Sequence, residues 1–248
     1  MLTKQELEEF WAEANKVYLD HISIDCVVFG FHGGQMKVLM LKSKNEEAWY
    51  LPGGFVQHNE PIETAADRIL NDRTGIEEIF LQQFHVFGDP DRTKIHNEMY
   101  QGNNFFAQRF ISIGYYALVD FFIVNPTPDT FSEVCTWRDL DNLPPFQLDH
   151  ERIFRTALDT LRLQLSYQPI GYNLMPKEFT MPELQKLYET IMGKKLDRRN
   201  FQRRILAFGI LDKLPQTRKG GAHKAPYLYS FNLENYQAAL KEGLKSGW

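Results

Sequence analysis

The sequence predicts a mixed α/β (α+β) protein of two domains, an α/β domain over residues 1–165 and a winged helix-turn-helix over residues 166–248. Two observations carry this prediction. β-rich runs and helical patterns alternate through the first part. After a short segment with two prolines and a glycine, two helical patterns and a hairpin pattern follow.

Charge separates the same two parts of the chain. Residues 166–248 hold 14 Lys and Arg against 7 Asp and Glu, whereas residues 1–165 hold 14 against 25. A basic part of this kind predicts a polyanionic partner. The alternative is that the basic part docks on the acidic part of the same chain.

The remaining composition concerns compartment and partners. The 248 residues include two cysteines and no Cys-x-x-Cys pair, so we expect no disulfide, no structural zinc and a reducing compartment. The N-terminal stretch MLTKQELEEFWAEANKVYLD is acidic and amphipathic, unlike a secretory signal. No apolar run approaches the ~20 residues of a membrane span. We therefore expect a cytoplasmic protein without a membrane partner.

The elements of the first domain follow in order. Thr3 and Glu6 are placed as a capping box for a helix over residues 4–19. The runs SIDCVVFGF and MKVLMLK, joined by HGGQ, predict a β-hairpin. A helical pattern in EPIETAADRILNDRTG ends at Gly75, a residue suited to a left-handed C-cap. Strand-like runs then lead to a helix over residues 148–165.

The second domain begins with helical patterns near residues 180–192 and 197–208, and a hairpin pattern covers residues 213–231. Asp197 is a good N-cap for the second helix. The apolar positions of that helix, which we expect to face inward, are Phe201, Ile205, Leu206 and Phe208.

The second of these helices presents polar side chains suited to double-stranded DNA. Arg can bind guanine edges, and Asn or Gln can bind adenine, in the major groove. A basic hairpin beyond that helix would contact phosphates as a wing. The alternative is a solvated basic face without a nucleic-acid partner. The predicted DNA-binding residues are Arg198, Arg199, Asn200, Gln202, Arg203, Arg204, Arg218, Lys219, His223 and Lys224.

A further motif lies between residues 53 and 76. Gly54, Glu60, Arg68 and Gly75 follow an LPGGF lead-in at the spacing of the Nudix box, so this segment resembles the Nudix family. The resemblance extends over most of residues 21–165 as an order of elements. It implies that the first domain is a Nudix α/β/α sandwich.

The box departs from the family pattern at the carboxylate positions. The family has Arg-Glu-apolar-x-Glu-Glu, but Ile69, Asp72 and Arg73 stand at the three carboxylate positions. Diphosphate hydrolysis needs a hard divalent cation held by clustered oxygen ligands, which Ile and Arg cannot supply. We therefore predict no enzyme, no catalytic residue, no metal and no cofactor. One alternative has Arg73 pointing to solvent while Asp72 and Glu60 hold one ion; another is an active Nudix hydrolase of ADP-ribose or related nucleoside diphosphates.

A disabled Nudix domain followed by a winged helix is similar to the Nudix-related (NrtR-like) transcriptional regulators of bacteria. FGDPDR at residues 87–92 and the stretches 109–120, 148–162 and 182–201 look like matching segments. The resemblance implies a transcriptional regulator, a repressor or an activator, and we expect a homodimer on a two-fold DNA operator because symmetric operators pair with symmetric proteins. The strands look most like the AraR branch of Bacteroidetes, which implies L-arabinose as effector and control of carbohydrate metabolism. The alternative is an ADP-ribose-sensing regulator of NAD metabolism.

A sugar site needs groups that pair with hydroxyls and aromatic surfaces that cover C–H faces. Asp25 stands out, because it is a carboxylate inside an otherwise apolar strand. Either a polyhydroxy ligand satisfies this carboxylate, or the strand turns it outward to water. The predicted effector-binding residues are Asp25, His85, Asp89, Arg92, Arg109 and Tyr115.

Overall fold

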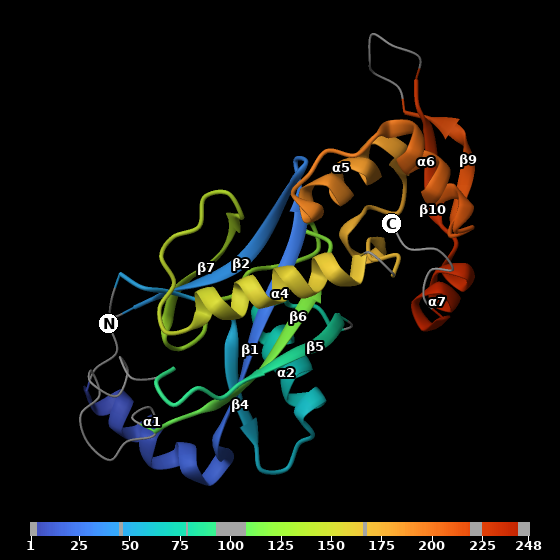
Figure 1. The fold of residues 1–248 in the computed structure, drawn as a ribbon. Helices are drawn as coiled ribbons and strands as arrows, with labels where there is room; N and C mark the ends of the chain where they lie inside the picture. Colours follow the sequence, from blue (N-terminus) through green and yellow to red (C-terminus); the bar gives the residue numbers. More distant parts are fainter. Residues whose placement is uncertain are drawn as a thin grey trace. The chain divides into compact units, whose positions relative to one another are not determined.

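The computed structural model describes residues 4–44, 47–77, 79–92, 108–165, 168–218 and 225–242. The chain forms two compact units (Figure 1). The first unit comprises Met1–Gly30 and Lys37–Ala157, and the second comprises Phe31–Met36 and Leu158–Trp248. No helix in the described ranges is long and apolar enough to cross a membrane. The sequence-based boundary at residues 165 and 166 stays a prediction.

A seven-stranded mixed sheet forms the centre of the first unit. The strand order is β3-β2-β1-β6-β5, with β4 paired to β1 and β7 paired to β2. β1 and β6 run parallel, whereas β5 and β6 are antiparallel. The strands are β1 (Tyr18–His32), β2 (Gln35–Ser43), β3 (Trp49–Tyr50), β4 (Gly53–Gln57), β5 (Phe80–Phe87), β6 (Ile111–Leu118) and β7 (Ser132–Asp139).

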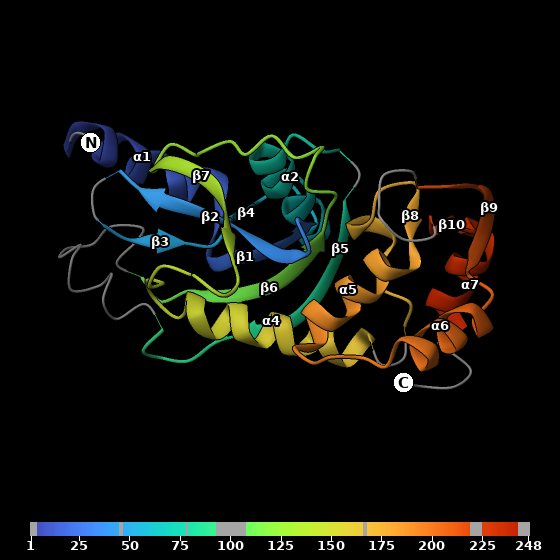
Figure 2. The ribbon, with the colours of Figure 1, turned by 90° about the horizontal axis from the view of Figure 1, so that it is seen from above.

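Three helices accompany this sheet: α1 (Lys4–Val17), α2 (Ile62–Thr74) and α4 (His150–Leu165). α2 and α4 cover opposite faces of the sheet (Figure 2). Gly75 ends α2 in the left-handed conformation, at φ 71°, and donates its N–H to Asn71 O, as the sequence predicts. The predicted capping residue Thr3 lies outside the described residues.

Alternation along β1 gives the two faces of the sheet different chemistry. Ile24, Cys26 and Val28 point into the apolar core on the α2 face. The residues between them therefore face α4, where Phe29 packs its ring against Phe154 at a centroid distance of 6.2 Å. Asp25 shares this α4 face, so its carboxylate lies between the sheet and a helix.

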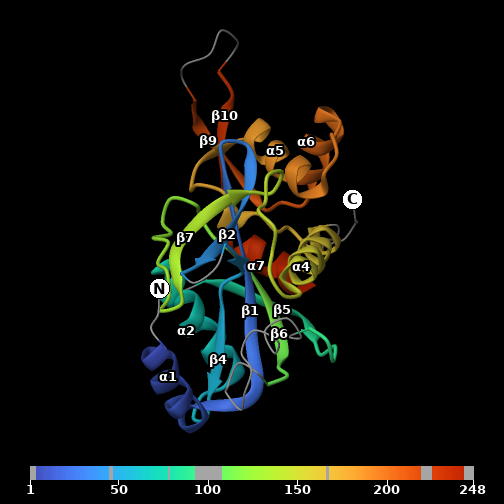
Figure 3. The same ribbon diagram turned by 90° about the vertical axis from the view of Figure 1, so that its left-hand side faces the viewer.

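The second unit is a helix-turn-helix with a small antiparallel sheet of order β8-β10-β9. The predicted helices and hairpin are present, whereas β8 and α7 were not predicted. Figure 3 shows the β9–β10 hairpin beside α5 and α6. The elements are β8 (Phe179–Thr180), α5 (Met181–Met192), α6 (Arg198–Ala207), β9 (Leu211–Thr217), β10 (Tyr227–Phe231) and α7 (Leu233–Glu242), after a short 3-10 helix, Tyr172–Leu174.

The core of the helix-turn-helix is formed where the two helices meet. Tyr188 of α5 and Phe201 of α6 make an edge-to-face ring pair at 5.3 Å, and Ile205 is fully buried. The expectation for Leu206 was wrong, because its side chain is 40% exposed. A ten-residue helix that packs through one narrow stripe leaves this neighbouring position in solvent.

Candidate functional site

The loop between β4 and α2 is organised by an ion pair. Glu60 accepts hydrogen bonds from Arg68 Nη2 at 2.6 Å and Nε at 3.0 Å, and from the backbone N–H of Gln57 at 2.7 Å. Arg68 also donates to the carbonyl of Phe55 at 2.9 Å. The Arg68 guanidinium holds the pKa of Glu60 below its ordinary value. Both Glu60 oxygens are thus engaged by Arg68, which argues against the alternative that Glu60 holds an ion with Asp72.

The altered box positions have taken other structural roles. Ile69 is 2% exposed and belongs to the apolar core, where its Cδ1 would lie 2.9 Å from a Cβ placed on Gly54. Arg73 Nη2 lies 3.4 Å from Asp129 Oδ2, and the Arg73 side chain is only 14% exposed. The alternative in which Arg73 points to solvent is therefore wrong, since α2 turns this side chain toward the loop that carries Asp129.

Among the described residues, no group of three or more His, Cys, Asp or Glu side chains could hold a metal ion. Asp72, the remaining box carboxylate, is exposed on α2. The predicted loss of hydrolysis stays a prediction.

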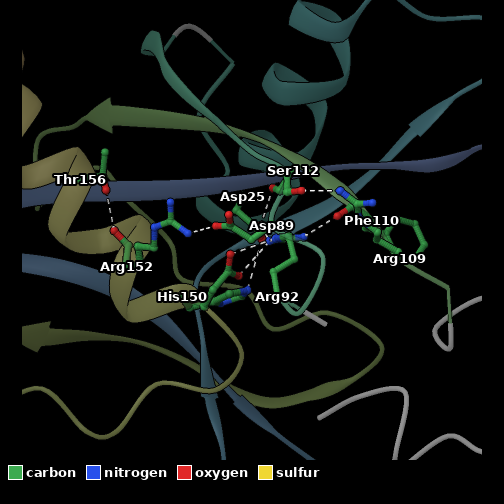
Figure 4. Close-up of polar contacts among 11 residues, drawn as sticks. Asp25, Asp89, Arg92, Arg109, Phe110, Ser112, His150, Arg152 and Thr156 are labelled. Atoms are coloured by element: carbon green, nitrogen blue, oxygen red, sulfur yellow. Dashed lines mark hydrogen bonds and ion pairs between the residues drawn. The ribbon is translucent and has the colours of Figure 1, made fainter. Parts of the chain in front are cut away.

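A buried polar network lies on the α4 face of the sheet (Figure 4). Asp25 Oδ2 accepts hydrogen bonds from Arg92 Nη2 at 3.2 Å and from the Ser112 hydroxyl at 2.5 Å. Arg92 also donates to both carboxylate oxygens of Asp149, at 2.9 and 3.0 Å, and to the carbonyl of Phe110 at 3.3 Å. The Asp25 side chain is 10% exposed and that of Arg92 is 3% exposed. Asp25 is thus neither turned to water nor dependent on a ligand, because Arg92 and Ser112 satisfy it.

His150 completes the network at the start of α4. Its Nδ1 accepts the backbone N–H of Leu51 at 2.9 Å, so the ring proton sits on Nε2, which lies 3.4 Å from Asp25 Oδ1. Burial lowers the pKa of His150, although the nearby Asp25 carboxylate acts in the opposite direction. The residue that leads into this site, Leu148, has a positive φ of 55°, a conformation that non-glycine residues rarely adopt. The turn before α4 therefore aims Asp149 and His150 into the protein.

The other predicted effector residues do not all join this network. Asp89 pairs with Arg152 of α4, and Arg109 donates to the carbonyl of Gly88 at 2.5 Å, so both lie at the turn after β5. His85 is exposed on β5. Tyr115 packs in the core on the opposite, α2, face, where burial raises its pKa. The structure thus brings Asp25 and Arg92 together, groups Asp89 with Arg109, and separates Tyr115 from both.

Four residues of this region were not predicted: Ser112, Asp149, His150 and Arg152. A sequence signal existed for two of them. Asp149 and His150 form a polar pair just before the apolar repeat of a helix, where capping explains them without a site. Ser112 and Arg152 carry no local signal, because their partners are distant in sequence.

The second candidate site is the exposed face of α6. Asp197 accepts the backbone N–H of Asn200 at 2.9 Å and so caps the helix, as predicted. Arg203 donates to Asn200 Oδ1 at 3.2 Å. The predicted DNA-binding side chains that are exposed on α6 are Arg198, Arg199, Asn200, Arg203 and Arg204, and Gln202 is half-buried. Of the predicted wing residues, Lys219, His223 and Lys224 lie outside the described residues.

The turn between α5 and α6 is fixed by side chains of α5. Glu189 accepts the backbone N–H of Leu196 at 2.9 Å, and this bond holds the pKa of Glu189 below its ordinary value. Gln185 donates to Glu189 at 3.0 Å and to the carbonyl of Leu196 at 2.9 Å. Gly193 begins the turn in the left-handed conformation, at φ 66°. α6 therefore starts from a defined position on α5.

The fold and the two sites define a Nudix domain joined to a C-terminal winged helix, which confirms the predicted fold class. Residues 19–157 match the NUDIX domain family, and residues 171–231 match the NrtR DNA-binding winged helix domain. Because the first match spans more than half of the sequence, the chain belongs to the Nudix family.

Individual relatives extend over both domains. The chain is 28% identical over 222 residues to a protein of Acinetobacter baylyi named ADPR responsive transcriptional repressor NtrR, covering 87% of this chain and 83% of that protein. Shewanella oneidensis NrtR, solved with a 27mer DNA, has a TM-score of 0.75 at 22% identity and covers 92% of this chain and 100% of its own. A MutT/nudix family protein from Enterococcus faecalis has a TM-score of 0.64 at 18% identity, with 94% and 100% covered. These two structures share the fold.

Proposed function

We propose that this protein is a DNA-binding transcriptional repressor whose Nudix domain binds ADP-ribose, or a closely related nucleoside diphosphate, without hydrolysing it. One observation carries the proposal: a Nudix box with Ile69 in the core and Arg73 paired to Asp129 shares a chain with an Asp197-capped basic helix. A domain that keeps the Nudix fold but not its carboxylates is suited to binding a ligand and reporting it. A DNA-binding regulator acts where the DNA is, so the proposal keeps the cytoplasmic location.

The lost chemistry follows from charge. Hydrolysis of a diphosphate requires cations that neutralise the phosphates and activate water, and oxygen ligands hold such cations. At the box, one ligand position is apolar and buried, and another is a cation that already pairs with Asp129. Glu60 is committed to Arg68. The proposal therefore assigns no metal, cofactor or catalytic residue to this chain.

DNA recognition is assigned to α6. Its exposed side chains include the arginines and the asparagine that suit base edges and phosphates in a major groove. We propose Arg198, Arg199, Asn200, Gln202, Arg203 and Arg204 as the contacting residues, with Lys219, His223 and Lys224 on the wing. A two-fold operator would require a homodimer, in which each protomer reads one half-site.

ADP-ribose is preferred over L-arabinose as the effector. The Acinetobacter baylyi relative, named for its response to ADPR, supports this choice. Two exposed guanidinium groups, those of Arg109 and Arg152, bond to the turn at Gly88 and Asp89, and arginines of this kind suit a diphosphate. The backbone N–H of Arg92 donates to the carbonyl of Asp89 at 3.2 Å, which links this turn to the buried network around Asp25. We therefore place the proposed effector site at residues 85–91, Arg109 and Arg152, and we leave out Tyr115 and the buried Asp25 and Arg92.

Three assays on the full chain test the proposal. A ligand that binds only the folded protein raises its melting temperature with concentration, so ADP-ribose should do so and L-arabinose should not. ADP-ribose should also weaken binding in a gel-shift assay with a duplex that the protein selects from random sequences. Incubation of ADP-ribose with the protein and Mg²⁺ should release no product. Stabilisation by L-arabinose alone would restore the sugar alternative, and turnover would establish a hydrolase.

Matched variants locate both sites. Arg109→Gln with Arg152→Gln should reduce the ADP-ribose-induced melting shift, whereas Arg155→Gln, on the same helix but paired to Glu151, should keep it. An unchanged shift in the double variant would move the effector site elsewhere. Arg203→Gln should weaken DNA binding, and unchanged gel shifts would remove α6 from the interface.

A further inference from the structure

One predicted DNA contact has a different set of partners. Arg218, at the end of β9, donates through Nη1 to Glu183 Oε1 at 2.5 Å and through Nη2 to the carbonyl of Glu178 at 3.2 Å. Its backbone N–H donates to the carbonyl of Pro226 at 3.0 Å, which closes the base of the wing hairpin. Arg218 thus bonds across the hairpin with its backbone and to the start of α5 with its side chain.

Glu183 occupies a second structural position at the same time. Its other oxygen, Oε2, accepts the backbone N–H of Thr180 at 2.7 Å and the Thr180 hydroxyl at 2.9 Å. The N–H of Glu183 points back to that hydroxyl, so the two residues form a capping box at the N-terminus of α5. One carboxylate therefore joins the first turn of α5 to the base of the wing.

The contact between Arg218 and Glu183 sets the orientation of the wing more than it adds to stability. The Arg218 and Glu183 side chains are 45% and 40% exposed, and ion pairs at such exposure add little to stability. A planar guanidinium held at two acceptors is nevertheless fixed in direction as well as in distance. The opposite end of α5 fixes α6 through Glu189 and Gln185. The wing and α6, the two proposed DNA-contacting elements, are thus both held in position by α5.

We infer that Arg218 is a positioning residue, which with Glu183 sets the wing relative to α5 and α6, and that it is not a phosphate contact. This inference rests on the proposed DNA binding. It also predicts an unusual effect of removing the Glu183 carboxylate. Removing an acidic residue near a DNA-binding surface ordinarily strengthens binding, because repulsion of the phosphates is lost. Here the same change should weaken binding, because the wing loses its orientation.

The salt dependence of binding separates the two roles of Arg218. A residue that neutralises one phosphate contributes about one to the slope of log K against log salt concentration. The probe is a selected duplex of about 30 base pairs, which has room for two half-sites one helical turn apart. Arg218→Gln and Glu183→Gln should each lower the affinity for this duplex several-fold, while the slope of log K against log salt concentration stays unchanged. Gln at position 183 can still complete the capping box. Arg203→Gln is the matched control, and in this variant the slope of log K against log salt concentration should become smaller in magnitude by about one.

Two further results decide the case. Arg218→Lys, which keeps the charge at the wing but cannot hold both acceptors, should restore the affinity only partly; full restoration indicates a charge contact. A reduced slope in Arg218→Gln, or tighter binding in Glu183→Gln, would overturn the inference.

A measurement without DNA tests the positioning role separately from the proposed function. Amide hydrogen exchange of the full chain should be several-fold faster over β9 in both Gln variants than in the wild type, while α6 should be unaffected. Unchanged exchange over β9 would refute the positioning role even if the protein binds no DNA. Failure of the wild type to bind any duplex would instead refute the proposed function.

Discussion

Replacing Arg92 with Met should destabilise the first unit strongly. The Arg92 side chain is 3% exposed and makes four hydrogen bonds, two to Asp149 and one each to Asp25 and the Phe110 carbonyl. Met fills a similar volume but leaves two carboxylates, 10% and 12% exposed, without their cation. Removing one partner from a buried ion pair costs about 3–5 kcal/mol, and two carboxylates share this one guanidinium. We therefore expect a loss of about 3–5 kcal/mol in the free energy of unfolding.

The assay is urea unfolding of the full chain, followed by tryptophan fluorescence in the absence of any ligand. The matched control is Arg155→Met on α4, because Arg155 pairs with Glu151 where the two side chains are 72% and 58% exposed. Such an exposed pair contributes at most about 1 kcal/mol. If Arg92→Met and Arg155→Met lose the same free energy, the network does not act as a buried unit and the reasoning fails.

Three other predictions concern single side chains. Burial lowers the pKa of His150, so the unfolded chain binds this proton first as the pH falls. The free energy of unfolding should therefore decrease below pH ~6.5. Urea titrations between weakly acidic and neutral pH should show that His150→Gln lacks this pH-dependent decrease. The same pH dependence in His150→Gln and the wild type would contradict the prediction. Asp197→Ala removes the cap on Asn200 and should cost about 1 kcal/mol by the same assay, with weaker DNA binding, whereas full retention of both would exclude a role for the cap. Gly114→Ala would place a Cβ 2.8 Å from both the Phe84 and the Phe87 rings, so we expect a loss of about 1–3 kcal/mol, and wild-type stability would show that both rings move freely.

Features set by neighbouring residues could be predicted from the sequence. Gly75 ends α2, Asp197 caps α6, and the wing strands flank a polar segment, because each depends on conformational preferences within a few residues. β8 was missed for the converse reason. It has only two residues, and it is a strand because β10 pairs with it across a long separation in sequence.

The site shows the same division between local and distant information. Asp25 was predicted as a site residue because it is a carboxylate in an apolar strand. Arg92 and Ser112, which satisfy this carboxylate, lie 67 and 87 residues away in the sequence. No periodicity or spacing links such positions, since the fold alone brings them together. Arg218 was predicted as a DNA contact because basic residues at a hairpin suit phosphates. Its acceptor Glu183, 35 residues earlier in the chain, became visible only in the structure.

The altered Nudix box is best understood as a set of substitutions that support one another. Ile69 lies beside Gly54 in the core, where only apolar side chains pack against it. Arg73 reaches Asp129, whose loop also caps α2, since the backbone N–H of Thr127 donates to the carbonyl of Arg73 at 3.0 Å. A carboxylate at position 73 would face Asp129 and repel it, and one at position 69 would enter the apolar core. Ile69 and Arg73 therefore both help to hold α2 in place, and Ile69→Glu or Arg73→Glu should each lower the free energy of unfolding of the domain.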